Sequence, residues 1–314
     1  MKILIAGGAG FIGSYLCEHY CGQDAEIICL DNLITGSKAN IASLLKRKNF
    51  TFLKTDVSRP LPKLPKEINL IFNLASPASP VDYYRYPLET LRVGSIGTEN
   101  LLELARKERA VFVLASTSEV YGDPVVHPQK EDYWGNVNPN GLRSVYDESK
   151  RYAEAVTAAY RRKYNLKTAI SRIFNTYGPR LRPADGRVVS NFISQALAGS
   201  PVTVYGDGSQ TRSLCYVSDL VAGLARLAGK ADAADNVVMN LGNAREITIL
   251  ELAGMIISLC RSRSKIIFQS LPDDDPARRC PDISRAKEIL DWEPLVPLEE
   301  GLKKTIGWFK GRGK

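Results

Sequence analysis

Tyr146 and Lys150 stand four residues apart in a segment whose apolar pattern predicts a helix over residues 144–164. At that spacing, two side chains share one face of a helix. A neighbouring ammonium stabilises a phenolate, so we expect Lys150 to lower the pKa of Tyr146 and make it a usable general base. The spacing is common by itself, and its meaning depends on the surrounding residues.

A row of hydroxyls and one carboxyl, Ser116, Thr117, Ser118 and Glu119, follows a predicted strand at 110–116. The carboxyl ends of parallel strands form the rim at which open sheets bind ligands. A hydroxyl on that rim could hold a substrate oxygen next to Tyr146. The two features together indicate proton transfer to or from a substrate hydroxyl.

A glycine motif precedes both features, with Gly7, Gly10 and Gly13 lying between a predicted strand at 2–6 and a predicted helix at 11–21. Glycine allows a tight turn and a close approach to a pyrophosphate, whose charge a helix N-terminus favours. Asp31 ends the second predicted strand, 18 residues after Gly13. A carboxylate there accepts hydrogen bonds from ribose hydroxyls and repels the extra phosphate of NADP, so the sequence predicts NAD as the cofactor.

Short apolar runs alternate with amphipathic ones along the chain. The predicted strands are 2–6, 26–30, 51–54, 69–75, 110–116, 168–174 and 237–241. The predicted helices are 11–21, 38–48, 88–108, 144–164, 188–198, 218–228, 248–260 and 298–310. This alternation predicts an α/β fold, a Rossmann-like doubly wound parallel sheet with a smaller, partly interleaved C-terminal substrate-binding domain.

Composition restricts the class of protein. The net charge is +8, but the motifs of nucleic-acid-binding domains are absent, so we expect no nucleic-acid partner. The chain contains no long apolar run, and a strand-like segment directly follows Met1, so we expect no membrane segment, no signal peptide and a cytoplasmic location. Six cysteines without a C-x-x-C pair and only two histidines predict reduced thiols and no metal site.

The chain resembles the extended short-chain dehydrogenase/reductase family of nucleotide-sugar enzymes, and within it the UDP-glucuronate decarboxylases, also called UDP-xylose synthases. The segments that carry the resemblance are L-A-S-P-A-S-P at 74–80, S-T-S-E-V-Y-G-D-P at 116–124, H-P-Q-K-E-D-Y-W-G at 127–135, Y-D-E-S-K at 146–150, R-I-F-N-T-Y-G-P-R at 172–180, D-G-R-V-V-S-N-F-I at 185–193, Y-G-D-G-S-Q-T-R at 205–212, Y-V-S-D-L at 216–220 and W-E-P-L-V-P-L-E-E-G-L at 292–302. They span nearly the whole chain. The first two point to the decarboxylases, whereas the glycine loop and the Tyr–Lys pair identify only the superfamily.

The resemblance implies a set of catalytic roles. Thr117 would be the partner of a substrate hydroxyl, Tyr146 the base, and Lys150 its pKa modifier and a ribose contact. Ser118 and Glu119 would face carbon 5 of the sugar and manage proton transfer there. The implied cofactor-binding residues are Gly7, Gly10, Phe11, Ile12, Gly13, Asp31, Asn32, Asp56, Leu74, Tyr146 and Lys150.

The resemblance also implies a nucleotide-sugar site. Asn175 and Arg212 match positions that hold the diphosphate, Val189 and Tyr205 would be walls for the base, and Arg279 would lie near the sugar carboxylate. On this basis residues 1–174 and 213–236 would form the NAD-binding domain. Residues 175–212 and 237–314 would form the nucleotide-sugar-binding domain.

Two positions depart from the family pattern. Ser149 stands where a glycine commonly precedes the catalytic lysine, and Cys280 stands where another basic residue is often found. The second departure removes a basic side chain at the end of the site that would contact the diphosphate.

The implied reaction is decarboxylation of UDP-glucuronate to UDP-xylose through a 4-keto intermediate, with NAD taking a hydride and returning it. The open alternatives are an oxidative decarboxylase that releases the UDP-4-keto-pentose, a nucleotide-sugar 4,6-dehydratase, a 4-epimerase and a non-catalytic NAD-sensing or scaffold protein. Family members pair helices like 88–108 and 144–164 across a four-helix bundle, so the resemblance also implies a homodimer.

Overall fold

The computed structural model describes residues 1–231, 237–271 and 278–312. Its main sheet is parallel throughout, with strand order β11-β6-β5-β4-β1-β2-β3. The strands are β1 Lys2–Ala6, β2 Glu26–Asp31, β3 Phe50–Lys54, β4 Leu70–Asn73, β5 Val111–Thr117, β6 Thr168–Ile173 and β11 Val237–Leu241. The direction of winding reverses between β1 and β4, where doubly wound folds bind nucleotides. All seven predicted strands and the predicted fold class are confirmed.

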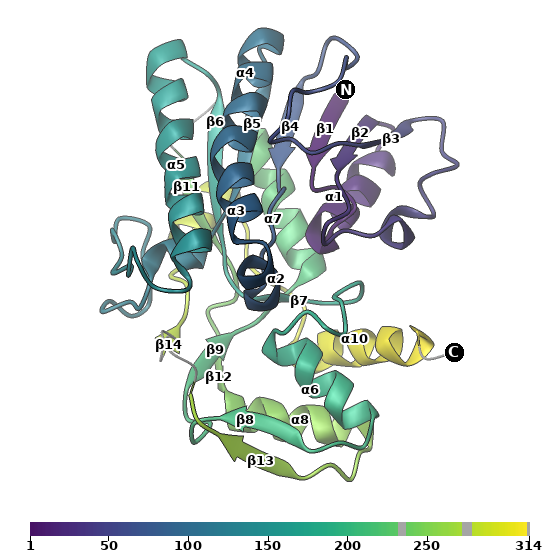
Figure 1. Cartoon of the computed structure of the whole chain (residues 1–314), viewed down its shortest axis with the longest axis vertical. Helices are drawn as coiled ribbons and strands as arrows, with labels where there is room; N and C mark the ends of the chain where they lie inside the picture. Colours follow the sequence, from purple (N-terminus) through teal and green to yellow (C-terminus); the bar gives the residue numbers. More distant parts are fainter. Residues whose placement is uncertain (232–236, 272–277, 313–314) are drawn as a thin grey trace.

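Helices cover both faces of this sheet (Figure 1). One layer contains α1 Phe11–Cys21 and α7 Val217–Lys230, and the other contains α4 Thr98–Glu108 and α5 Ser144–Tyr164. The alternation of strand side chains explains both layers, because Ile3 and Ile5 of β1 belong to one buried cluster and Leu4 to the other. Before α4, the helix α3 Pro87–Arg92 continues through a π turn, η2 Val93–Gly97, as the predicted helix 88–108 requires.

A smaller part gathers below the sheet in Figure 1. It consists of α6 Val188–Leu197, β8 Val202–Tyr205, α8 Ile249–Cys260, β13 Ile266–Gln269 and α10 Leu298–Arg312. The remaining short elements are α2 Pro80–Arg85, the pair β7 Thr176–Tyr177 with β10 Cys215–Tyr216, and the sheet of β12 Glu246–Thr248, β9 Thr211–Ser213 and β14 Arg278–Arg279. Helix α9 Ser284–Leu290 lies near α7 and β11.

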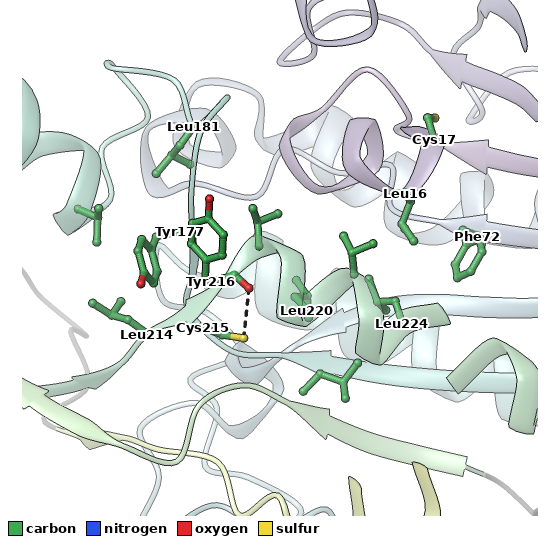
Figure 2. Packing of buried hydrophobic residues seen from close by; sticks show 14 of the residues in the cluster. Leu16, Cys17, Phe72, Tyr177, Leu181, Leu214, Cys215, Tyr216, Leu220 and Leu224 are labelled. Carbon is green, nitrogen blue, oxygen red and sulfur yellow. Dashed lines mark hydrogen bonds between the residues drawn. The ribbon is translucent and has the colours of Figure 1, made fainter. Parts of the chain in front are cut away.

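The two parts share one continuous hydrophobic core. Figure 2 shows Leu16 of α1, Leu220 and Leu224 of α7, and the tyrosines Tyr177 and Tyr216 within the same cluster. The Cys215 thiol donates to the Tyr216 carbonyl at 3.6 Å at the start of α7. Because this core is continuous, the smaller part is packed against the main part next to the rim of the main sheet.

Two expectations fail. The helix predicted at 38–48 is only a short 3-10 turn, η1 Lys38–Ile41, because Asn40 donates to the Ala9 carbonyl at 2.9 Å and ties the segment to the glycine loop. The predicted domain boundary before residue 237 is also misplaced, because Val237–Leu241 pairs with β6 in the main sheet.

No helix in the described ranges is both long and apolar enough to cross a membrane. The same ranges contain no group of three or more histidine, cysteine or acidic side chains that could hold a metal ion. All six cysteines are free and buried.

Candidate active site

The glycine loop brings the end of β1 against the end of β4. Gly7 has a φ of +78°, and a Cβ there would lie 2.7 Å from the Leu74 carbonyl carbon. A Cβ on Gly13 would collide with the Gly7 carbonyl. Gly10 begins α1 without any side-chain cap, so the first amides of the helix remain available for an anionic group such as a pyrophosphate.

Asp31 is oriented by the same loop. Its two carboxylate oxygens accept from the amides of Ala9 at 2.9 Å and Leu33 at 2.8 Å. Burial raises the pKa of Asp31, and the hydrogen bonds from Leu33 and Ala9 oppose that shift. A fixed carboxylate at the end of β2 fits the two hydroxyls of a ribose.

A cavity of about 240 Å³ opens beside this loop. Its lining includes six residues expected to bind the cofactor: Gly7, Gly10, Asp31, Asn32, Asp56 and Leu74. Phe11, Ile12 and Gly13 instead form the first turn of α1 next to it. Sequence reasoning missed Arg59 and Arg92, which also line the cavity but carry no recognisable motif. The glycine cradle, the helix N-terminus and the carboxylate fit a dinucleotide.

Tyr146 and Lys150 lie in the first half of α5, and Thr117 ends β5 beside them. All three are buried. The Lys150 ammonium donates to the Ala115 carbonyl at 2.8 Å and stands 5.9 Å from the centre of the Tyr146 ring. The structure therefore brings together the three side chains that the sequence predicted to act as base, pKa modifier and substrate partner.

Burial dominates the pKa values of both Tyr146 and Lys150 in this structure. Burial raises the pKa of Tyr146 to about 12, although the hydrogen bond with Thr117 acts in the opposite direction. Burial also lowers the pKa of Lys150 to about 8. The expected lowering of the Tyr146 pKa by Lys150 stays a prediction.

Tyr83 of α2 fixes the position of the Tyr146 ring. The two rings are stacked, with centres 5.2 Å apart and planes inclined by 6°. Ser79 caps α2 by accepting from the Asp82 amide at 3.3 Å, and its hydroxyl donates to the Asp82 carboxylate at 2.8 Å. Tyr83 was missed from sequence; the L-A-S-P-A-S-P segment that contains Ser79 was the available signal.

A second cavity, of about 260 Å³, lies next to this site. Glu119 from η3 Ser118–Tyr121 forms ion pairs there with Arg143 and Arg279. Arg279 also donates to the Gly122 carbonyl at 2.8 Å. Burial alone would raise the pKa of Glu119, but the two guanidinium groups hold it well below its usual range. Arg143 and Asp147, which also line this cavity, were missed from sequence.

These ion pairs change the expected role of Glu119. A carboxyl held ionised by two arginines is a poor proton donor, so Glu119 does not suit the proton transfer at carbon 5 that the resemblance implied. Ser118 is buried in η3. Ser116 is also drawn away from the rim, because its hydroxyl donates to Glu154 at 2.6 Å in a network that Arg172 completes.

The residues expected to hold the nucleotide lie on different elements around the smaller part. Asn175 links β6 to β7, Val189 is buried in α6, and Tyr205 ends β8 with 41% of its surface exposed. None of these three, nor Arg212, is among the residues that line the two cavities described above. Arg212 of β9 pairs in register with Arg279 of β14, and Arg279 lines the second cavity. The small sheet therefore connects Arg212 to that cavity.

Both departures from the family pattern have a structural explanation. A Cβ on Gly94 would lie 2.6 Å from the Cβ of Ser149, so the glycine that permits close helix packing stands in η2 and not before Lys150. Cys280 is buried and its thiol donates to the Ala244 carbonyl at 3.3 Å. It therefore packs inside the protein and contributes no charge to the site.

A doubly wound sheet with a glycine loop, an ordered carboxylate after β2 and a Tyr–Lys pair on the rim defines a dinucleotide-dependent enzyme of the short-chain dehydrogenase/reductase class. Residues 3–242 match the model of the NAD dependent epimerase/dehydratase family, and the chain belongs to this family. Membership confirms that the protein is an enzyme and that NAD is its cofactor.

Curated relatives confirm the finer resemblance. The chain is 52% identical over 308 residues to UDP-glucuronic acid decarboxylase 1 of Danio rerio, covering 98% of this chain and 72% of that protein. It is 49% identical to UDP-glucuronic acid decarboxylase 3 of Arabidopsis thaliana, covering 96% of this chain and 87% of that protein.

Solved structures agree with the fold. A UDP-glucuronic acid 4-epimerase variant from Bacillus cereus, in complex with UDP-4-deoxy-4-fluoro-glucuronic acid and NAD, is 27% identical and superposes with a TM-score of 0.89 over 99% of this chain and 100% of that chain. UDP-glucose 4-epimerase of Thermotoga maritima, with UDP-glucose, is 29% identical with a TM-score of 0.89 and full coverage of both chains.

Proposed function

We propose that the protein decarboxylates UDP-glucuronate to UDP-xylose with bound NAD. The observation that carries the proposal is the second cavity, in which two guanidinium groups face one ionised carboxylate beside Tyr146. Arg143 and Arg279 are the two cationic side chains of this lining, and a guanidinium group can bind the carboxylate of a sugar bidentately. The names of the curated relatives support the same substrate.

The proposed chemistry begins with oxidation at carbon 4, because a sugar carboxylate leaves only when the electron pair has an acceptor. NAD, when bound, supplies the acceptor for the hydride of carbon 4 and later returns it. Tyr146 takes the proton of the 4-hydroxyl, and Thr117 holds the same oxygen. The resulting ketone lies β to the carboxylate, so carbon dioxide departs and leaves an enolate. Thr117 and Tyr146 donate to its oxygen and stabilise the negative charge.

We assign the remaining site residues to the cofactor or to the substrate according to their positions in the structure. Gly7, Gly10 and Asp31 would hold the pyrophosphate and the adenosine ribose of NAD, with Asn32, Asp56 and Leu74 completing the cavity. Asn175 and Arg212 would hold the diphosphate of the substrate, and Val189 and Tyr205 its base. Residues 1–174, 213–231 and 237–241 then form the NAD-binding part, and the other described residues form the sugar-binding part.

The alternative reactions fit less well. A 4,6-dehydratase benefits from an acid after the threonine, where this chain has Ser118, a hydroxyl too weak for that role. A 4-epimerase retains the carboxylate, and although solved structures of similar fold include epimerases, the curated relatives reported above are decarboxylases. A non-catalytic sensor or scaffold would not need Thr117, Tyr146 and Lys150 in one buried group.

We also propose a homodimer through the face formed by α3, η2 and α5. This face exposes apolar side chains, including Leu88, Leu91, Ile96 and Tyr152. Several exposed large apolar side chains on packed neighbouring helices support a protein–protein contact there. The free thiols of the six cysteines fit the proposed cytoplasmic location.

The test is incubation with NAD and UDP-glucuronate labelled with ¹³C at the carboxyl carbon. We expect labelled carbon dioxide, a UDP-pentose by mass, and no net absorbance change at the NADH band once conversion is complete. NADH that rises in step with carbon dioxide would instead identify the oxidative decarboxylase. Absence of labelled carbon dioxide would refute decarboxylation.

A further inference from the structure

Asp147 is a buried carboxyl that the mechanism above does not use. It follows Tyr146 in the first turn of α5, is 5% exposed and lines the second cavity. Within the part of the chain that the structure describes, its Oδ1 atom is buried and has no hydrogen-bond partner. A buried polar atom without a partner is uncommon, and a catalytic role is one of the explanations for it, beside strain and an ordered water or ion.

The surroundings of Asp147 favour its protonated form. Glu119 faces it from η3 and Glu148 from its own helix, while Arg143 and Arg279 act in the opposite direction. Both arginines also form ion pairs with Glu119, so Asp147 shares their positive charge with that carboxylate. Burial and the Glu119 charge raise the pKa of Asp147 to about 8. Asp123 also lines this cavity, and Tyr83 interacts electrostatically with Asp147.

We propose that Asp147 is the acid that protonates carbon 5 of the sugar after carbon dioxide has left, an inference that rests on the proposed function. The bond between carbon 5 and the carboxyl carbon breaks, and its electron pair forms the enolate. The enolate electrons then take the Asp147 proton, which forms a carbon–hydrogen bond, restores the 4-ketone and leaves Asp147 as a carboxylate. Water replaces the proton through the cavity, whose lining includes the exposed Asp123 and Asn138.

Other acids in the site are less suited to this step. Glu119 is held ionised by two arginines and has no proton to give. Tyr146 stabilises the oxygen on carbon 4 and is needed again when that oxygen regains its proton. Asp147 lies one residue further along the helix and lines the cavity that contains the two arginines. It is therefore placed near the position that the departing carboxylate vacates.

The experiment compares D147N with E148Q, a matched loss of one carboxyl at the neighbouring, more exposed position, whose partner Arg151 lies 3.7 Å away. We expect D147N to fold, bind NAD and lose turnover by roughly 100-fold or more, the lower range for a positioned acid. E148Q should stay near the wild-type rate. In D₂O the wild type should place deuterium on one face of carbon 5, whereas D147N should yield both stereoisomers because water supplies the proton.

The pH profile provides a second readout. Lys150 also has a pKa lowered to about 8, but it is unchanged in every variant, so the ratio of wild-type to D147N turnover isolates Asp147. That ratio should fall as the pH rises above about 8, where the wild type loses the Asp147 proton. D147E, which keeps the acid, should recover part of the rate and the single stereoisomer, and it serves as the test if D147N fails to fold.

The possible failures are distinguishable. If the wild type releases no carbon dioxide from UDP-glucuronate, the proposed function is wrong. If the wild type is active and D147N retains both its rate and its single stereoisomer, the function stands and Asp147 is not the acid. A stereochemically unchanged product from a slow D147N would also overturn the proposal, because it would show that Asp147 supports the fold of the site and not the proton transfer.

Discussion

Glu119→Gln is the perturbation that most directly tests the charge arrangement of the site. The amide keeps the size of the side chain but removes the negative charge that Arg143 and Arg279 share. The side chain of Arg279 is only 4% exposed and that of Arg143 15%. Two guanidinium groups would then lose their shared ion-pair partner in a largely buried position.

The expected loss of stability follows from this burial. Removing one partner of a buried ion pair typically destabilises a protein by about 3–5 kcal/mol. Glu119 borders a cavity and keeps some contact with solvent, so we expect the lower end, about 3 kcal/mol. For a domain of this size, that corresponds to a fall in melting temperature of roughly 6–12 °C.

The pH dependence of this difference has a defined sign. Burial would raise the pKa of Glu119, but Arg279 and Arg143 lower it from 4.5 to about 2. A group whose pKa is depressed on folding contributes stability above its unfolded pKa and loses it as the pH falls toward the folded value. The difference in free energy of unfolding between wild type and E119Q should be constant above about pH 4.5. It should shrink as the pH falls from there to about 2.

The assay is urea unfolding and calorimetry of wild type, E119Q and E148Q over this pH range. E148Q is the control because its ion pair with Arg151 is about 40% exposed and should contribute less than about 1 kcal/mol. An E119Q protein that melts within about 1 °C of E148Q would refute the reasoning, since the two arginines would then not depend on Glu119.

Three further predictions concern other parts of the molecule. Tyr146→Phe should keep the fold and NAD affinity but lose turnover by at least ~100-fold, and near wild-type decarboxylation would contradict its assignment as base. Asp31→Ala should narrow the preference for NAD over NADP in calorimetric titrations, whereas equal affinity of the wild type for both would count against the ribose contact. Leu91→Lys should shift the protein toward the monomer in ultracentrifugation, while Val125→Lys, at a position 81% exposed outside α3, η2 and α5, should not; a monomeric wild type would contradict the dimer.

The main sheet was predictable because each strand is a short apolar run and most crossovers between strands carry a helical period. Ile3 and Leu4 show how this works, since adjacent residues of β1 enter different hydrophobic clusters and the strand therefore has no polar face. The segment at 38–48 has a helical pattern too, but a tertiary contact, the hydrogen bond from Asn40 to Ala9, determines its shape. Local periodicity contains no information about such a contact.

The same limit explains what was missed in the site. The glycine loop, Asp31 and the Tyr–Lys pair are local motifs, and their positions follow from the elements that contain them. The cluster of Glu119, Arg143 and Arg279 instead joins three segments that are far apart in the chain. The resemblance identified Glu119 as a residue of the site, but only the assembled cluster determines its protonation. Once two arginines hold that carboxyl ionised, the proton for carbon 5 needs another source, and the neighbouring Asp147 becomes chemically significant.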